Sequence, residues 1–151
     1  MRTSEIRYKD DDYEVVIVVR QASVMQGMYR TELVVAGEKR LYEDYPELVD
    51  TDNLSAENRV KLNILRMYYQ HTFPACIAAT KSITCADDTT LLILSQLTMT
   101  EFLELPESLV DVWVSAVFTD NPHWMPKLAK SKATDPGEEK EPSDEKQSTD
   151  S

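Results

Sequence analysis

The side chains best suited to proton transfer or metal binding are two histidines, His71 and His123. They lie far apart in the sequence, and no further ligands stand near either at metal-binding spacing. His71 falls at the end of a predicted helix, where a cation suits the negative end of the helix dipole. His123 is expected in a partly exposed loop. We therefore expect no metal centre and no histidine-based catalysis.

The acidic run Asp10–Asp12 could offer carboxylate oxygens to a divalent cation. It lacks the alternating ligands, the central glycine and the distal glutamate of a calcium loop, so a solvated turn is the favoured interpretation. The whole chain has three glycines, too few for the usual phosphate-binding loops, which need close backbone approach to the anion. The sequence thus predicts no cofactor and no enzymatic activity.

Cys76 and Cys85 lack CxxC spacing, so reduced, partly buried thiols are favoured over a disulfide. Acidic residues near the amino terminus stand where a signal peptide needs an apolar core, and no apolar run reaches the roughly 18 residues of a membrane span. We expect a soluble, cytoplasmic protein that is neither secreted nor membrane-bound. The net charge of −11 argues against nucleic acid and favours a protein partner.

A β-branched run at residues 13–19 predicts a buried strand after the acidic turn. Ile6 and Tyr8 alternate with charged residues and could pair with that strand as a hairpin. An isolated hairpin is only marginally stable, so helices must pack on it.

Apolar spacing predicts a helix over residues 22–43 with Ser23 as its cap, although residues 31–36 would also suit a strand. The strongest helix covers residues 55–73, and its apolar face should make it central to the core. Pro74 should kink or restart this helix, and residues 75–84 then enter the core. That apolar face comprises Val60, Ile64, Leu65, Tyr68 and Tyr69.

Residues 89–97 fit a short helix or a buried strand, and the pattern leaves both open. Thr98 and Glu101 have capping-box spacing. Pro106 suits the first turn of a further helix, which Asn121 and Pro122 should end.

The sequence therefore predicts an α+β, mostly α domain over residues 1–126, with a short amino-terminal β-hairpin or strand packed on a helical bundle. Residues 127–151 include no aromatic residue and one leucine. Such a segment cannot bury enough apolar surface to offset its ordering, so a disordered carboxy-terminal tail is expected.

Met25, Met28 and Tyr29 could form an adaptable partner-binding surface, because thioethers repack against different shapes. Core packing is the favoured use of these residues, and of Trp113 in the middle of an apolar stripe. Trp124 follows a helix stop and is bracketed by prolines, so it either folds back as a plug or anchors a partner.

The run Gln96-Leu-Thr-Met-Thr-Glu-Phe-Leu-Glu-Leu-Pro106, followed by Trp113 and by Asn121-Pro122, resembles the tail assembly chaperones of long-tailed bacteriophages. The order of a short β element, a helical body and a charged end is similar too. The resemblance implies a non-catalytic protein of the host cytoplasm that binds the tape measure protein, keeps it soluble and helps to recruit tail tube subunits. A longer frameshifted form is common in that family, and a homo-oligomer would suit a filamentous client.

The family offers no catalytic residues, so partner contacts are predicted from expected exposure alone: Met25, Met28, Tyr29, Trp124 and Met125. Two other classes stay open. An acidic adaptor or regulatory interaction module outside phages would share the helices and the tail. A small enzyme would need polar groups that converge in a pocket, for example Asp10–Asp12 with His71 in a cleft.

Overall fold

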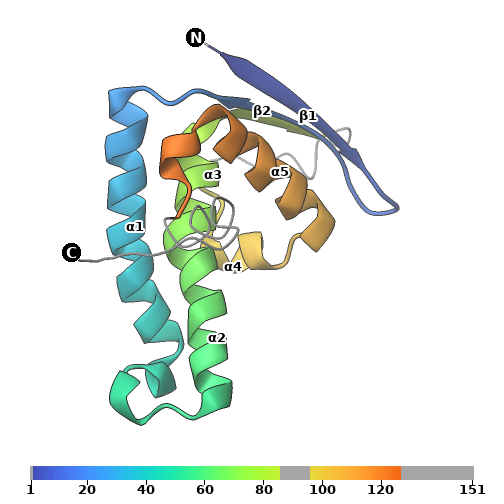
Figure 1. The fold of residues 1–151 in the computed structure, drawn as a ribbon. Helices are drawn as coiled ribbons and strands as arrows, with labels where there is room; N and C mark the ends of the chain where they lie inside the picture. The colour runs from blue at the N-terminus through green and yellow to red at the C-terminus, as the bar shows by residue number, and fades with distance from the viewer. Residues whose placement is uncertain (1, 86–95, 127–151) are drawn as a thin grey trace, which may run out of the picture.

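The computed structural model describes residues 2–85 and 96–126. It shows a mostly helical α+β fold with a three-stranded antiparallel sheet, in the order β1-β2-β3 (Figure 1). The predicted fold class is confirmed. The predicted tail, 127–151, and residues 89–95 of the ambiguous segment lie outside the described residues.

The amino-terminal hairpin joins β1 (Thr3–Lys9) to β2 (Glu14–Arg20), with Ile6 opposite Ile17. The turn is held by Asp10, whose carboxylate accepts hydrogen bonds from the amides of Asp12 and Tyr13 at 2.8 and 2.7 Å. These bonds lower the pKa of Asp10, and the hydrogen bond from the Tyr8 hydroxyl contributes most. The predicted hairpin and the predicted solvated turn are both observed.

A third strand, β3 (Thr80–Cys85), pairs with β2 and was not predicted. It follows a helix with no turn residue between them, and its exposed positions are polar. Residues 75–84 therefore form a helix end and a strand rather than one core segment.

Helix α1 (Val24–Asp44) begins at Ser23, which forms a capping box with Gln26. The helix is continuous, so the alternative of a strand over residues 31–36 is wrong. Two short 3-10 turns, Pro46–Leu48 and Thr51–Asn53, connect it to the next helix.

Helix α2 (Ala56–Met67) continues through the π-helical segment η3 (Tyr68–Thr72) into α3 (Phe73–Ala79). Pro74 lies in the first turn of α3, as expected for a restarted helix. The wider turn before it spares the proline ring a clash with the preceding carbonyls. Residues Pro74–Ala79 are all buried, which makes α3 the centre of the core.

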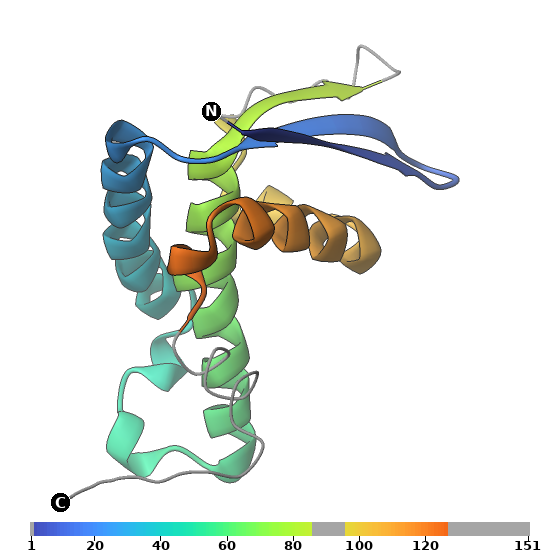
Figure 2. The same ribbon diagram turned by 45° about the horizontal axis from the view of Figure 1, so that its top comes forward.

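The carboxy-terminal elements are α4 (Met99–Leu103), α5 (Glu107–Asp120) and a 3-10 turn, Pro122–Trp124. The predicted capping box of Thr98 and Glu101 is present. Figure 2 shows α5 running beneath the sheet and beside α3. Trp113 joins these layers: its indole N–H donates to the Thr80 hydroxyl at 2.8 Å, and that hydroxyl donates to the Cys76 carbonyl at 2.6 Å.

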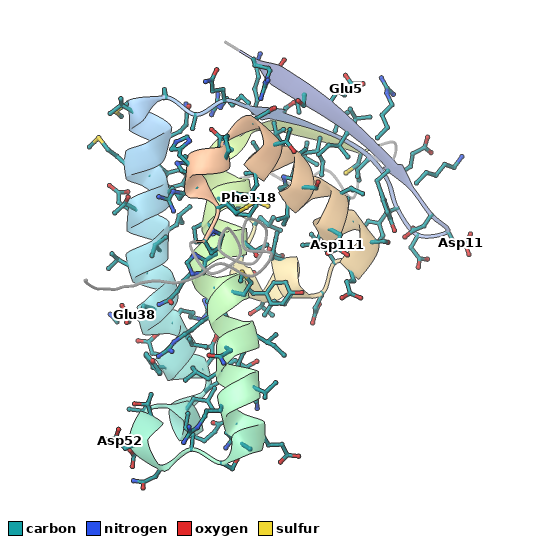
Figure 3. All side chains as sticks on the ribbon, in the orientation of Figure 1. Glu5, Asp11, Glu38, Asp52, Asp111 and Phe118 are labelled. Atoms are coloured by element: carbon teal, nitrogen blue, oxygen red, sulfur yellow. The ribbon has the colours of Figure 1, made fainter. Side chains whose placement is uncertain are left out.

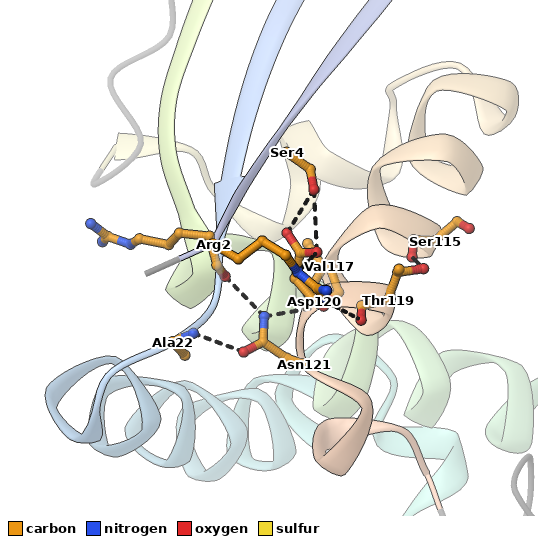
Figure 4. Close-up of polar contacts among 9 residues, drawn as sticks. Arg2, Ser4, Ala22, Ser115, Val117, Thr119, Asp120 and Asn121 are labelled. Atoms are coloured by element: carbon orange, nitrogen blue, oxygen red, sulfur yellow. Dashed lines mark hydrogen bonds and ion pairs between the residues drawn. The ribbon is translucent and has the colours of Figure 1, made fainter.

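Asn121 fastens the end of α5 to the junction between β2 and α1 (Figure 4). Its side chain is fully buried, donates to the carbonyls of Arg20 and Val117, and accepts from the Ala22 amide at 2.8 Å. Beside it, Asp120 accepts a hydrogen bond from Ser4. Asn121, which was expected only to stop the helix, thus also fixes the sheet on the helices, together with Asp120.

Gly37 allows α1 to lie directly on η3. A Cβ atom at Gly37 would stand 2.2 Å from the carbonyl oxygen of Tyr69, whereas one at Gly27 would meet nothing within 4 Å. The close contact therefore depends on the missing side chain at one of the two helical glycines.

Candidate partner-binding groove

An open apolar groove lies between α2–η3 on one side and α5 on the other, with a volume of about 1060 Å³. Met125 and Pro126 line it as well. We call this feature the α2–α5 groove. Its apolar helical lining consists of Ile64, Met67, Tyr68, Val110, Val114 and Phe118. Figure 3 labels Phe118, which lies near the carboxyl end of α5.

The groove exists because only part of the apolar stripe of α2 is buried in the core. Leu62 is buried, but Val60 and Ile64 are 59% and 52% exposed. The extra residue in the η3 turn rotates the following helix by roughly 100° relative to an unbroken α-helix. The predicted single core-facing stripe is therefore wrong for Val60 and Ile64, and Ile64 lines the groove instead.

The groove also contains charged and titratable side chains. Arg66 lies on α2 and donates to the Tyr42 hydroxyl at 2.9 Å, and Asp111 lies on α5. His71 lines the groove from η3, and its pKa is lowered by burial and, to a smaller extent, by Arg30. The groove thus offers apolar area with one cationic and one anionic group at its sides.

We expect His71 to make the stability of the fold depend on pH. Because its folded-state pKa lies below the ordinary value of 6.5, the unfolded chain binds this proton more readily, and stability falls as pH drops through that value. We expect His71→Asn to flatten the change in Tm between pH 7.5 and pH 5.5, measured by circular dichroism. An unchanged pH profile would contradict the assignment, and His123→Asn, at an exposed position, is the control.

The residues expected for an enzyme are not brought together. Asp10–Asp12 form the tip of the hairpin, where Figure 3 labels Asp11, while His71 lies on η3 in the α2–α5 groove. Within the described ranges, no cluster of three His, Cys, Asp or Glu residues could hold a metal ion. Cys76 is fully buried, and burial raises its pKa well above the ordinary value, so it remains a thiol.

The five predicted contact residues fall into three places. Met25, Met28 and Tyr29 are exposed on α1, at 71%, 56% and 40%, so the core packing favoured for them is wrong. Trp124 is buried as a plug, with the Arg30 guanidinium 4.9 Å from the centre of its ring, so its expected exposure is wrong. Met125 lines the α2–α5 groove. A partner contact at any of the five stays a prediction.

Sequence reasoning missed most of the groove. Ile64 was contained in a predicted apolar helical stripe, and a stripe does not distinguish a core face from an open groove. One signal could have indicated the groove: the apolar stripe of α2 includes more residues than one buried helix face contains.

In comparisons with known proteins, no family model, no curated protein and no solved structure matches the chain. Of the segments the structure describes, none includes a helix with the combined length and apolarity needed to cross a bilayer.

Proposed function

We propose that this protein is a non-catalytic assembly chaperone of the phage tail type. The α2–α5 groove would hold an amphipathic helix of a tape measure protein in the host cytoplasm, keep that client soluble, and leave it available to tail tube subunits. The observation that supports the proposal is an open apolar groove of about 1060 Å³ flanked by two helices, together with the resemblance of residues 96–124.

A helix is the occupant that this groove fits best. Helices pack at interaxial distances of about 8–10 Å, and an amphipathic helix places anchors at three- and four-residue steps in such a groove. The 14-residue α5 is about 21 Å long at 1.5 Å per residue, so its wall can contact several turns of a client. Arg66 and Asp111 supply both signs of charge to the polar edges of that client helix.

Ile64→Glu tests the groove directly, because it places a carboxylate on an exposed apolar lining position. We expect at least a tenfold loss of affinity for a helical tape measure fragment, measured by fluorescence anisotropy, with Tm changed by no more than a few degrees. The matched control is Val60→Glu, one turn earlier on α2, similarly exposed and outside the groove lining.

Equal losses in the two variants would show that the groove is not the binding surface. Binding of amphipathic helices without any preference for the tape measure protein would favour the adaptor class instead.

A further inference from the structure

Helix α1 lies along the outer side of the molecule (Figure 1), and its exposed face is rich in apolar side chains. Five of the eleven exposed large apolar side chains among the described residues lie on its first four turns, and a local concentration of this kind is typical of an interaction site. The large ones are Val24 at 81%, Met25 at 71%, Met28 at 56%, Tyr29 at 40% and Val35 at 65% exposed.

An open pocket of about 390 Å³ lies beside this face, between the first turns of α1, the segment before it and the 3-10 turn Pro122–Trp124. Its lining from α1 comprises Val24, Gly27, Met28 and Thr31, a spacing of i, i+3, i+4 and i+7. Four residues at this spacing form the hole that receives one side chain of a facing helix in knobs-into-holes packing. The space beside Gly27 is empty, because a Cβ atom at this position would meet nothing within 4 Å. Trp124 also lines the pocket.

The same face also carries the knobs. Val24, Met28, Thr31 and Val35 follow one another at steps of four, three and four residues, which is the seam of a two-stranded coiled coil. A patch that has both knobs and holes is self-complementary, and a twofold dimer requires such a patch. We propose that a second copy of this chain binds here, with the two α1 helices packed antiparallel.

Charge favours this place and this orientation. The chain has a net charge of −11, so two copies repel each other over most of their surface. The stretch 24–36 carries only Arg30 and Glu32, so repulsion is smallest there. A parallel pair would place Glu32 and Glu38 beside their own copies, whereas an antiparallel pair sets Val24 against Val35 and leaves Glu38 outside the overlap.

One helix face is small for an interface, because specific complexes bury about 1,200–2,000 Å² in total. We therefore expect a concentration-dependent dimer rather than a permanent one. Sedimentation velocity of the full chain should show a monomer at low micromolar concentration and a dimer at high micromolar concentration.

Met28→Glu should weaken the dimer at least tenfold. Val35→Glu should have the same effect, and it serves as a second test if Met28→Glu fails to fold. The matched control is Val112→Glu on α5, which is 43% exposed and lies outside this face. A wild-type protein that stays monomeric at millimolar concentration would overturn the proposal, and so would equal dimerisation of the Met28 and Val112 variants.

Engineered cysteines test the orientation. A mixture of Val24→Cys and Val35→Cys chains should form a disulfide between positions 24 and 35 under mild oxidation, identified by mass spectrometry, while neither variant alone should cross-link. Cross-linking of Val24→Cys with itself would contradict the antiparallel arrangement. The α2–α5 groove uses other residues, so loss of the dimer and loss of client binding are separate results.

Discussion

Replacing Gly37 with alanine is expected to destabilise the fold by about 3 kcal/mol or more, at the upper end of overpacking effects. The added Cβ would stand 2.2 Å from the Tyr69 carbonyl oxygen, which is backbone and has no flexible end to move aside. The whole of α1 must therefore shift away from η3. Chemical denaturation followed by circular dichroism measures the loss.

Gly27→Ala is the matched control, in the same helix and with open space around the new atom. It should stabilise the protein by about 0.5–1 kcal/mol, because alanine loses less backbone entropy than glycine in a helix. The two variants should be compared at low protein concentration, so that self-association does not contribute. Similar effects of the two substitutions would mean that α1 does not lie against η3 as described.

Asn121→Ala should lower the free energy of unfolding by about 2–4 kcal/mol, because it removes three side-chain hydrogen bonds to buried backbone groups, although the Val117 carbonyl keeps its bond from the Asn121 amide. The groups concerned are the Ala22 amide and the carbonyls of Arg20 and Val117. Asn53→Ala is the control: Asn53 is exposed and its side chain donates to Asp50, so the change should stay within about 0.5 kcal/mol.

Asn121→Asp distinguishes hydrogen bonding from simple packing. The carboxylate can still accept from the Ala22 amide, but it has no donor for the two carbonyls and would repel them. It should therefore be nearly as unstable as Asn121→Ala. An aspartate variant with wild-type stability would show that the side-chain donors of Asn121 contribute little.

The elements that could be predicted are those defined by local signals. The hairpin follows from a β-branched run beside an acidic turn, and the starts of α1 and α4 follow from Ser23 and Thr98, whose caps the structure contains. Trp113 was placed in the core because it lies within an apolar stripe, and it is fully buried.

The elements that were missed depend on distant contacts. β3 is a strand because β2 offers it an edge, and its own residues alternate weakly. The π-helical turn of η3 has no local sequence signature, and its carbonyl at Tyr69 meets a glycine more than thirty positions earlier. That turn changes the helical register between α2 and α3. The residues of α2 that face the groove could therefore not be derived from the apolar stripe alone.

The central claim is that the α2–α5 groove binds a helix of another polypeptide. Hydrogen–deuterium exchange of the full chain, with and without a helical tape measure fragment, tests it most directly. We expect slower exchange on client addition in α2, η3 and α5, with no change in the hairpin of β1 and β2. Protection confined to the hairpin, or no protection at a saturating client concentration, would contradict it.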